Sequence, residues 1–180
     1  MSGAVPRHHL LSLAADGSAQ AGQTGLWPYT QQRWRPWRAR RHSLLDPVNA
    51  VVVATAPDQV HTALLADGWH RPDDGASHAT WFEGRFIPMS DHIALGDRAE
   101  RVHVRLFAIA GHTLVAAHHE VADERGHHIV TSWDRARERL GEALAASGWS
   151  ECGASEPLLT VQLRGVDGDG RLWRYIRGDD

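Results

Sequence analysis

The stretch from residue 101 to residue 134 constrains this chain most, because it begins with a strict alternation of polar and apolar residues. The apolar positions are Val102, Val104 and Leu106, and the polar ones are Arg101, His103 and Arg105. A period of two predicts a β-strand with one face against a core. The charge on its other face points to a structural or chemical role for that face.

A second strand, from Thr113 to Val121, follows closely, and Ala110-Gly111 between them suits a tight hairpin turn. The resulting pairs are Ile109 with His112, Phe107 with Leu114, Arg105 with Ala116, His103 with His118, and Arg101 with Glu120. A slip by one residue would move Glu120 among the valines, so the polar pattern favours this register. The sequence thus predicts a polar face that holds His103, Arg105, His118 and Glu120.

A polar loop, 122–128, comes next, and we expect its Gly126-His127-His128 end to fold back over the polar face. Thr131 then predicts the start of a helix, with Thr131 as the N-cap and Asp134 at the third position of a capping box.

The remaining segments predict a sheet covered by helices. The apolar run 50–54 suits a buried central strand, and a helix should follow from a Thr55 N-cap to Gly68. Both expected helices end in Gly-Trp, at Gly68-Trp69 and at Gly148-Trp149. Segment 80–85 suits a short strand or a helical turn, and segment 86–98 suits a loop with an edge strand.

These segments predict an α+β fold. We expect a mixed or antiparallel sheet with two helices on one face, on a ferredoxin-like split βαβ plan, and a C-terminal β-hairpin from 158–163 and 172–176. The expected organisation is a flexible N-terminal tail over 1–25, a Trp/Arg-rich arm over 26–45, and a single α+β domain over 46–180.

Composition narrows the classes of protein to which this chain can belong. A net charge of -3 argues against a nucleic-acid binder, and one cysteine in 180 residues excludes an internal disulfide framework. The absence of lysine excludes Schiff-base chemistry and a P-loop. No apolar run reaches the length of a membrane span, and the N-terminus lacks a signal-peptide core, so we expect a cytoplasmic protein.

The arm over 26–45 interleaves Trp27, Trp34 and Trp37 with arginines and two prolines. The prolines exclude a continuous helix. Such a segment can stack on a phosphate-bearing ligand, but an apolar strap packed on the domain is the simpler interpretation, with a homodimer contact as a variant of it.

Several short motifs resemble the LssY C-terminal domain family over roughly residues 46–149. They are Asp46-Pro47-Val48-Asn49 before a valine strand, Gly68-Trp69, Arg101-x-His103-x-Arg105-Leu106, and His127-His128-Ile129 followed by Asp134-x-x-Arg137. In many bacterial proteins this domain follows a membrane phosphatase module, which these residues do not contain. The resemblance implies no activity for the domain itself.

Two chemical hypotheses and a structural one remain open for the polar face. In the first, Arg101, Arg105, Glu120 and Arg137 form a pocket for an anionic small molecule, with His103 or His128 as general acid or base, as in a hydrolase. In the second, His103, His118 and His128 bind a divalent metal such as zinc, as a hydrolase centre. In the third, the histidines are half-buried on a solvated sheet face that serves only in assembly, while Arg101 pairs with Glu120 and Arg137 pairs with Glu138 or Asp134.

Overall fold

The computed structural model describes residues 10–13, 19–22, 29–32, 44–73, 78–82, 85–155 and 166–178. The tryptophans Trp27, Trp34 and Trp37 and the expected strand 158–163 lie outside these residues. The two helices are α1 (Pro57–Ala66) and α2 (Asp134–Ala146). The strands are β1 (Leu10–Leu13), β2 (Ala19–Gly22), β3 (Tyr29–Gln32), β4 (Leu44–Pro47), β5 (Ala50–Val52), β6 (His78–Phe82), β7 (Arg85–Pro88), β8 (Asp91–Gly96), β9 (Glu100–Ile109), β10 (His112–Ala122), β11 (His128–Ser132), β12 (Trp149–Ala154) and β13 (Trp173–Arg177).

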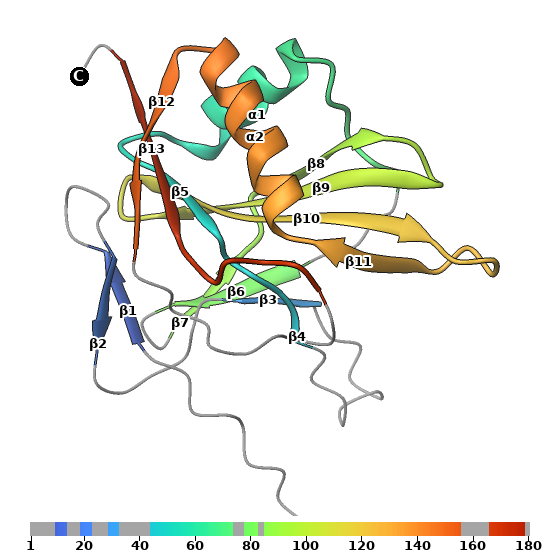
Figure 1. Cartoon of the computed structure of the whole chain (residues 1–180). Coiled ribbons are helices and arrows are strands. Elements are labelled where there is room, and N and C mark those ends of the chain that lie inside the picture. Colours follow the sequence, from blue (N-terminus) through green and yellow to red (C-terminus); the bar gives the residue numbers. More distant parts are fainter. Residues whose placement is uncertain are drawn as a thin grey trace, which may run out of the picture.

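The main sheet has the order β12-β13-β5-β10-β9-β8, and β11 pairs with β10 beside this path. It is mixed, because β13 runs parallel to β5 while the other neighbours are antiparallel. Both helices cover the same face (Figure 1). The α+β prediction, the central position of the strand that begins at Ala50 and the edge position of β8 are therefore confirmed.

The core under the helices follows from the alternation in the strands. Val102, Val104 and Leu106 of β9 pack there with Leu64 of α1 and Leu140 of α2. Each of these side chains is at most 7% exposed. The apolar face of β9 therefore meets both helices, as its pattern predicts.

The opposite face of the main sheet meets a second, four-stranded sheet of order β4-β3-β6-β7 (Figure 1). Phe107 and Leu114 are buried on this face, and Ile87 of β7 and Met89 pack against them. The segment 80–85 thus contributes a strand rather than a helical turn, and β3 lies inside the arm over 26–45. A separate pair, β1 with β2, lies within the predicted N-terminal tail.

The β9–β10 hairpin has the predicted register, with His103 opposite His118 and Arg101 opposite Glu120. Its turn places Ala110 at φ 45° and Gly111 at φ 83°. Positive φ at both central residues is the geometry of a type I′ turn, whose twist matches that of the strands. The hairpin prediction is confirmed, with an alanine in a conformation that favours glycine or asparagine.

Both predicted N-caps are wrong. Ala56, not Thr55, precedes α1, and the Thr55 hydroxyl donates to the carbonyl of Val53 at 2.8 Å. Thr131 lies in β11, and Ser132 accepts a hydrogen bond from the backbone of Arg135 at the start of α2. Both C-terminal predictions hold, because Gly68 and Gly148 follow the helices at φ 87° and 90°.

The structure does not confirm the ferredoxin-like plan. In that plan the strand after the second helix would lie beside β5, but β13 lies between β12 and β5. Trp173 to Ile176 do form a strand, yet its partners in the described part of the chain are β12 and β5. Neither α1 nor α2 is long and apolar enough to cross a membrane.

Candidate functional site

Six polar residues meet on the face of the main sheet that lies away from the helices. This polar cluster consists of Arg101, His103 and Arg105 from β9, His118 and Glu120 from β10, and His128 from β11. The alternation in β9 and β10 directs these side chains to one face, and the β10–β11 pairing places His128 near Glu120. The predicted grouping of His103, Arg105, His118 and Glu120 is therefore present.

The cluster is buried, which overturns the prediction of half-buried histidines on a solvated face. His103 is 2% exposed, His118 is 1% exposed and Arg105 is 6% exposed. His128 is the most exposed member of the cluster, with 27% of its side chain exposed, and 10% of the Arg101 side chain is exposed. Charged groups are rarely buried to this extent unless they are paired or hydrogen-bonded.

Glu120 is the centre of the hydrogen bonds. It forms an ion pair with Arg101 and lies 2.8 Å from His118 Nε2, while His128 Nδ1, 2.8 Å from Glu120, accepts a hydrogen bond from Nη2 of Arg101 at 2.8 Å. Burial alone would raise the pKa of Glu120, but the hydrogen bond from His118 and the charge of Arg101 outweigh it and lower the pKa to about 2. Glu120 is therefore a carboxylate at neutral pH.

The hydrogen bonds also fix the protonation of His118. Its Nδ1 lies 3.3 Å from Nη1 of Arg105, and a guanidinium can only donate. His118 Nδ1 must then accept, so Nε2 carries the proton and donates to Glu120. His118 is a neutral imidazole whose lone pair is already engaged.

His103 differs from its neighbours because neither of its ring nitrogens has a hydrogen-bond partner in the described part of the chain. Its Nδ1 lies 4.0 Å from Glu120 Oε1, beyond hydrogen-bonding distance. Burial, and after it the positive charge of Arg105, holds the pKa of His103 well below its usual range. The buried imidazole therefore offers one N–H donor and one free lone pair.

The contacts of two further histidines, His92 and His61, were not predicted. His92 on β8 packs edge-on against His103, with ring centroids 5.5 Å apart. On the helix side, His61 of α1 pairs with Asp91, which also binds Arg71 at 2.9 Å. His92 and Ile93 point to opposite faces of β8, and this alternation is the sequence signal that could have revealed His92. The nearby Pro88 made the strand hard to recognise.

The other predicted site residues lie elsewhere. Arg137 of α2 is on the helix side of the sheet, where it stacks on Trp173 and contacts Glu138 at 3.7 Å. His127 is exposed and pairs with Asp123, so only His128 of the predicted loop reaches the cluster. His119 points away from His118 and lies between Thr131 and Glu100.

His103, His118 and Glu120 each place a possible metal-ligand atom within 4.8 Å of the other two. The donor types suit zinc or iron. The surroundings suit a cation poorly, because the lone pair of His118 is taken by Arg105 and Glu120 is paired with Arg101. A divalent ion would have to displace both contacts next to two guanidinium groups, those of Arg101 and Arg105.

Comparison with protein-family models, with curated proteins and with solved structures finds no match to this chain.

Proposed function

We propose that the polar cluster binds an anionic small molecule through a carboxylate or phosphate group. The observation that carries this proposal is His103, a buried imidazole whose two nitrogens have no hydrogen-bond partner among the residues that the structure describes. A buried polar group without a partner costs about 1–3 kcal/mol, so a site of this kind favours a ligand that supplies the missing hydrogen bond.

The charge of the cluster decides the class of ligand. Arg101 and Arg105 bring two guanidinium charges to the cluster, and the carboxylate that the described residues place there is that of Glu120. Guanidinium groups attract an anion and repel a divalent cation. The His103 N–H would donate to the anion, and the guanidinium of Arg105, two residues along the same face, would support it.

The same proposal includes catalysis by the polar cluster on the bound molecule. The free lone pair of a neutral imidazole can accept a proton from water, so His103 suits the role of general base toward a bound ester. His128, at the exposed rim and 2.8 Å from Glu120, is positioned to exchange protons with solvent. The resemblance to the LssY C-terminal domain family adds no activity to this, and homodimer formation through the arm over 26–45 stays a separate prediction.

The test uses protein without a histidine tag, titrated with inorganic phosphate and with acetate and followed by the side-chain NMR signals of histidine. We expect saturable shifts in the native protein and their loss in His103→Phe and Arg105→Gln. Arg98→Gln, which removes an exposed arginine, is the matched control and should bind like the native protein. Equal binding by all four proteins, or no binding by the native one, would contradict the proposal.

The metal hypothesis is the second candidate, favoured by the spacing of the donor atoms of His103, His118 and Glu120. Elemental analysis after dialysis against zinc decides it. We expect no stoichiometric metal. Zinc retained by the native protein and lost in His103→Phe would establish the metal site in place of the anion site.

A further inference from the structure

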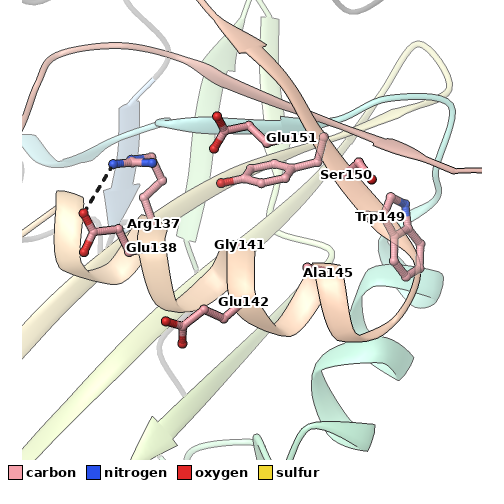
Figure 2. A pocket seen from close by; sticks show the side chains of 9 residues that line it. Arg137, Glu138, Gly141, Glu142, Ala145, Trp149, Ser150 and Glu151 are labelled. Atoms are coloured by element: carbon pink, nitrogen blue, oxygen red, sulfur yellow. Dashed lines mark ion pairs between the residues drawn. The ribbon is translucent and has the colours of Figure 1, made fainter.

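A second group of functional side chains lies between α2 and the strands β12 and β13, on the helix side of the main sheet. It lines a pocket of about 490 Å³ (Figure 2). The residues that matter here are Arg137, Glu138, Gly141 and Glu142 from α2, Glu151 from β12 and Tyr175 from β13. None of these residues belongs to the polar cluster.

Arg137 stacks on Trp173 and is hydrogen-bonded to Tyr175, while one of its nitrogens lacks a partner among the described residues. Its guanidinium carbon lies 4.1 Å from the centroid of the Trp173 ring, which fixes the plane of the group. Its Nη2 lies 3.7 Å from Glu138, a long contact marked in Figure 2. Its Nε is buried without a hydrogen-bond partner in the described part of the chain. The edge formed by Nε and Nη2 is the edge that binds a carboxylate with two parallel hydrogen bonds.

Tyr175 supplies a donor beside Arg137. Burial, opposed by the nearby charge of Arg137, raises the pKa of Tyr175 to about 12, so it remains a phenol. A side chain at position 141 would bring its Cβ to 3.1 Å from the Tyr175 hydroxyl. Gly141 therefore leaves the space in which the hydroxyl lies under α2, next to the pocket.

Carboxylates line the rest of the pocket. Glu142 of α2 is 71% exposed and forms an ion pair with Arg139 at 3.4 Å, and Glu151 is exposed on β12. In Figure 2 Glu151 extends from the strand, and Glu142 extends from the side of the helix that lies away from it. The pocket thus combines an arginine and a phenol that bind a negative group with acidic groups that attract a positive one.

We propose that this pocket binds a zwitterion of the α-amino acid class. The carboxylate of the ligand binds the Nε–Nη2 edge of Arg137 and the Tyr175 hydroxyl, and its ammonium group faces Glu151. The inference is independent of the function proposed for the polar cluster, since the two sites lie on opposite faces of the sheet.

The test is a titration of the isotope-labelled full chain with each of the free α-amino acids at up to millimolar concentration, followed by backbone NMR. We expect saturable shifts at Gly141 and Ser150 with at least one of them. The N-acetyl derivative lacks the ammonium charge and the methyl ester lacks the carboxylate, so both should bind more weakly.

Arg137→Gln should weaken binding about tenfold or more, because a charge-assisted bidentate contact is lost. Arg135→Gln removes an exposed arginine from the same helix outside this pocket and should bind like the native protein. Glu151→Gln, at an exposed position, should weaken binding about threefold and serves as the second variant if Arg137→Gln disturbs the fold. His103→Phe should bind normally, which separates this site from the polar cluster.

Three results would overturn the proposal. They are the absence of saturable shifts with every amino acid, equal binding of the free, acetylated and esterified forms, and native affinity in both Arg137→Gln and Glu151→Gln.

Discussion

His103 and Glu120 lie on neighbouring strands with 4.0 Å between Nδ1 of the imidazole and Oε1 of the carboxylate. The two side chains differ in whether they have hydrogen-bond partners. Glu120 is bound by Arg101 and His118, whereas both nitrogens of His103 lack a partner in the described residues. Glu120 therefore stabilises the fold, and His103 is the group that remains available to a ligand.

Replacement of Glu120 by glutamine should destabilise the protein. The amide keeps the shape of the side chain but removes the negative charge from the ion pair with Arg101, whose side chain is only 10% exposed. Breaking a buried ion pair in this way costs about 3 kcal/mol or more. Urea unfolding should report this loss in Glu120→Gln and almost none in Glu124→Gln, which is exposed on the hairpin loop. Equal stability of the two variants would show that the pairing contributes nothing.

Stability should fall with decreasing pH because of His103. Burial and the charge of Arg105 hold the pKa of folded His103 well below 6.5, its ordinary value. Below pH 6.5 the unfolded chain binds a proton that the folded protein does not, so acid favours unfolding. The contribution is fully present above that pH and is lost as the pH falls toward the folded pKa, with a slope of at most about 1.4 kcal/mol per pH unit.

Unfolding free energies measured in steps from neutral to mildly acidic pH check this prediction. His103→Phe removes the titrating group, so its stability should depend less steeply on pH than that of the native protein. His127→Gln removes an exposed histidine and should keep the native slope. A native slope in His103→Phe would mean that another group carries the pH dependence.

The turn of the β9–β10 hairpin offers a stabilising substitution. Ala110 has φ 45°, a conformation that costs an alanine about 1 kcal/mol and costs glycine almost nothing. Ala110→Gly should therefore raise the free energy of unfolding by about 0.5–1 kcal/mol. Ala108→Gly, two residues earlier in β9, is the control and should lower it, because glycine weakens a strand. A loss of stability in both variants would contradict the turn geometry.

The members of the polar cluster on β9 and β10 were predictable, because one periodic pattern determines which of their side chains share a face. The alternation of charges in β9 and β10 admits one register, and that register brings His103, His118 and Glu120 together. The depth of burial was not predictable, because the second sheet that covers this side of the main sheet comes from distant short strands with no strong period of their own.

Other predictions failed because they rested on local sequence rules, whereas contacts between distant parts of the chain determine the position of the residue. Thr131 suits an N-cap by sequence, but its hydroxyl lies 2.6 Å from Nδ1 of His119, so it remains in β11. Arg137 follows the polar strands closely in the chain, yet α2 lies on the other face of the sheet. The parallel pairing of β13 with β5 has no local signature, because it joins segments more than a hundred residues apart.

Asn49 provides the last prediction, since its side chain extends the pairing between β5 and β10. Its amide donates to the carbonyl of Ala117 at 2.8 Å, and its oxygen accepts from the amide of Ala117 at 2.9 Å. Asn49 thus binds one buried residue of β10 as a neighbouring strand would, just beyond the end of β5. This asparagine belongs to the Asp46-Pro47-Val48-Asn49 motif, which therefore has a structural role in this chain.

Asn49→Asp removes the side-chain N–H donor from this pair of hydrogen bonds and keeps the acceptor oxygen. The new carboxylate can still accept from Ala117 N but places negative charge against the carbonyl of Ala117 in a buried position. We expect a loss of about 2–4 kcal/mol in the free energy of unfolding, measured by urea denaturation near neutral pH. Gln59→Glu makes the same chemical change on the exposed side of α1, where the side chain only accepts a hydrogen bond, and should be nearly neutral. If both variants lost stability equally, the cost would come from added negative charge alone and the strand-like role of Asn49 would be wrong.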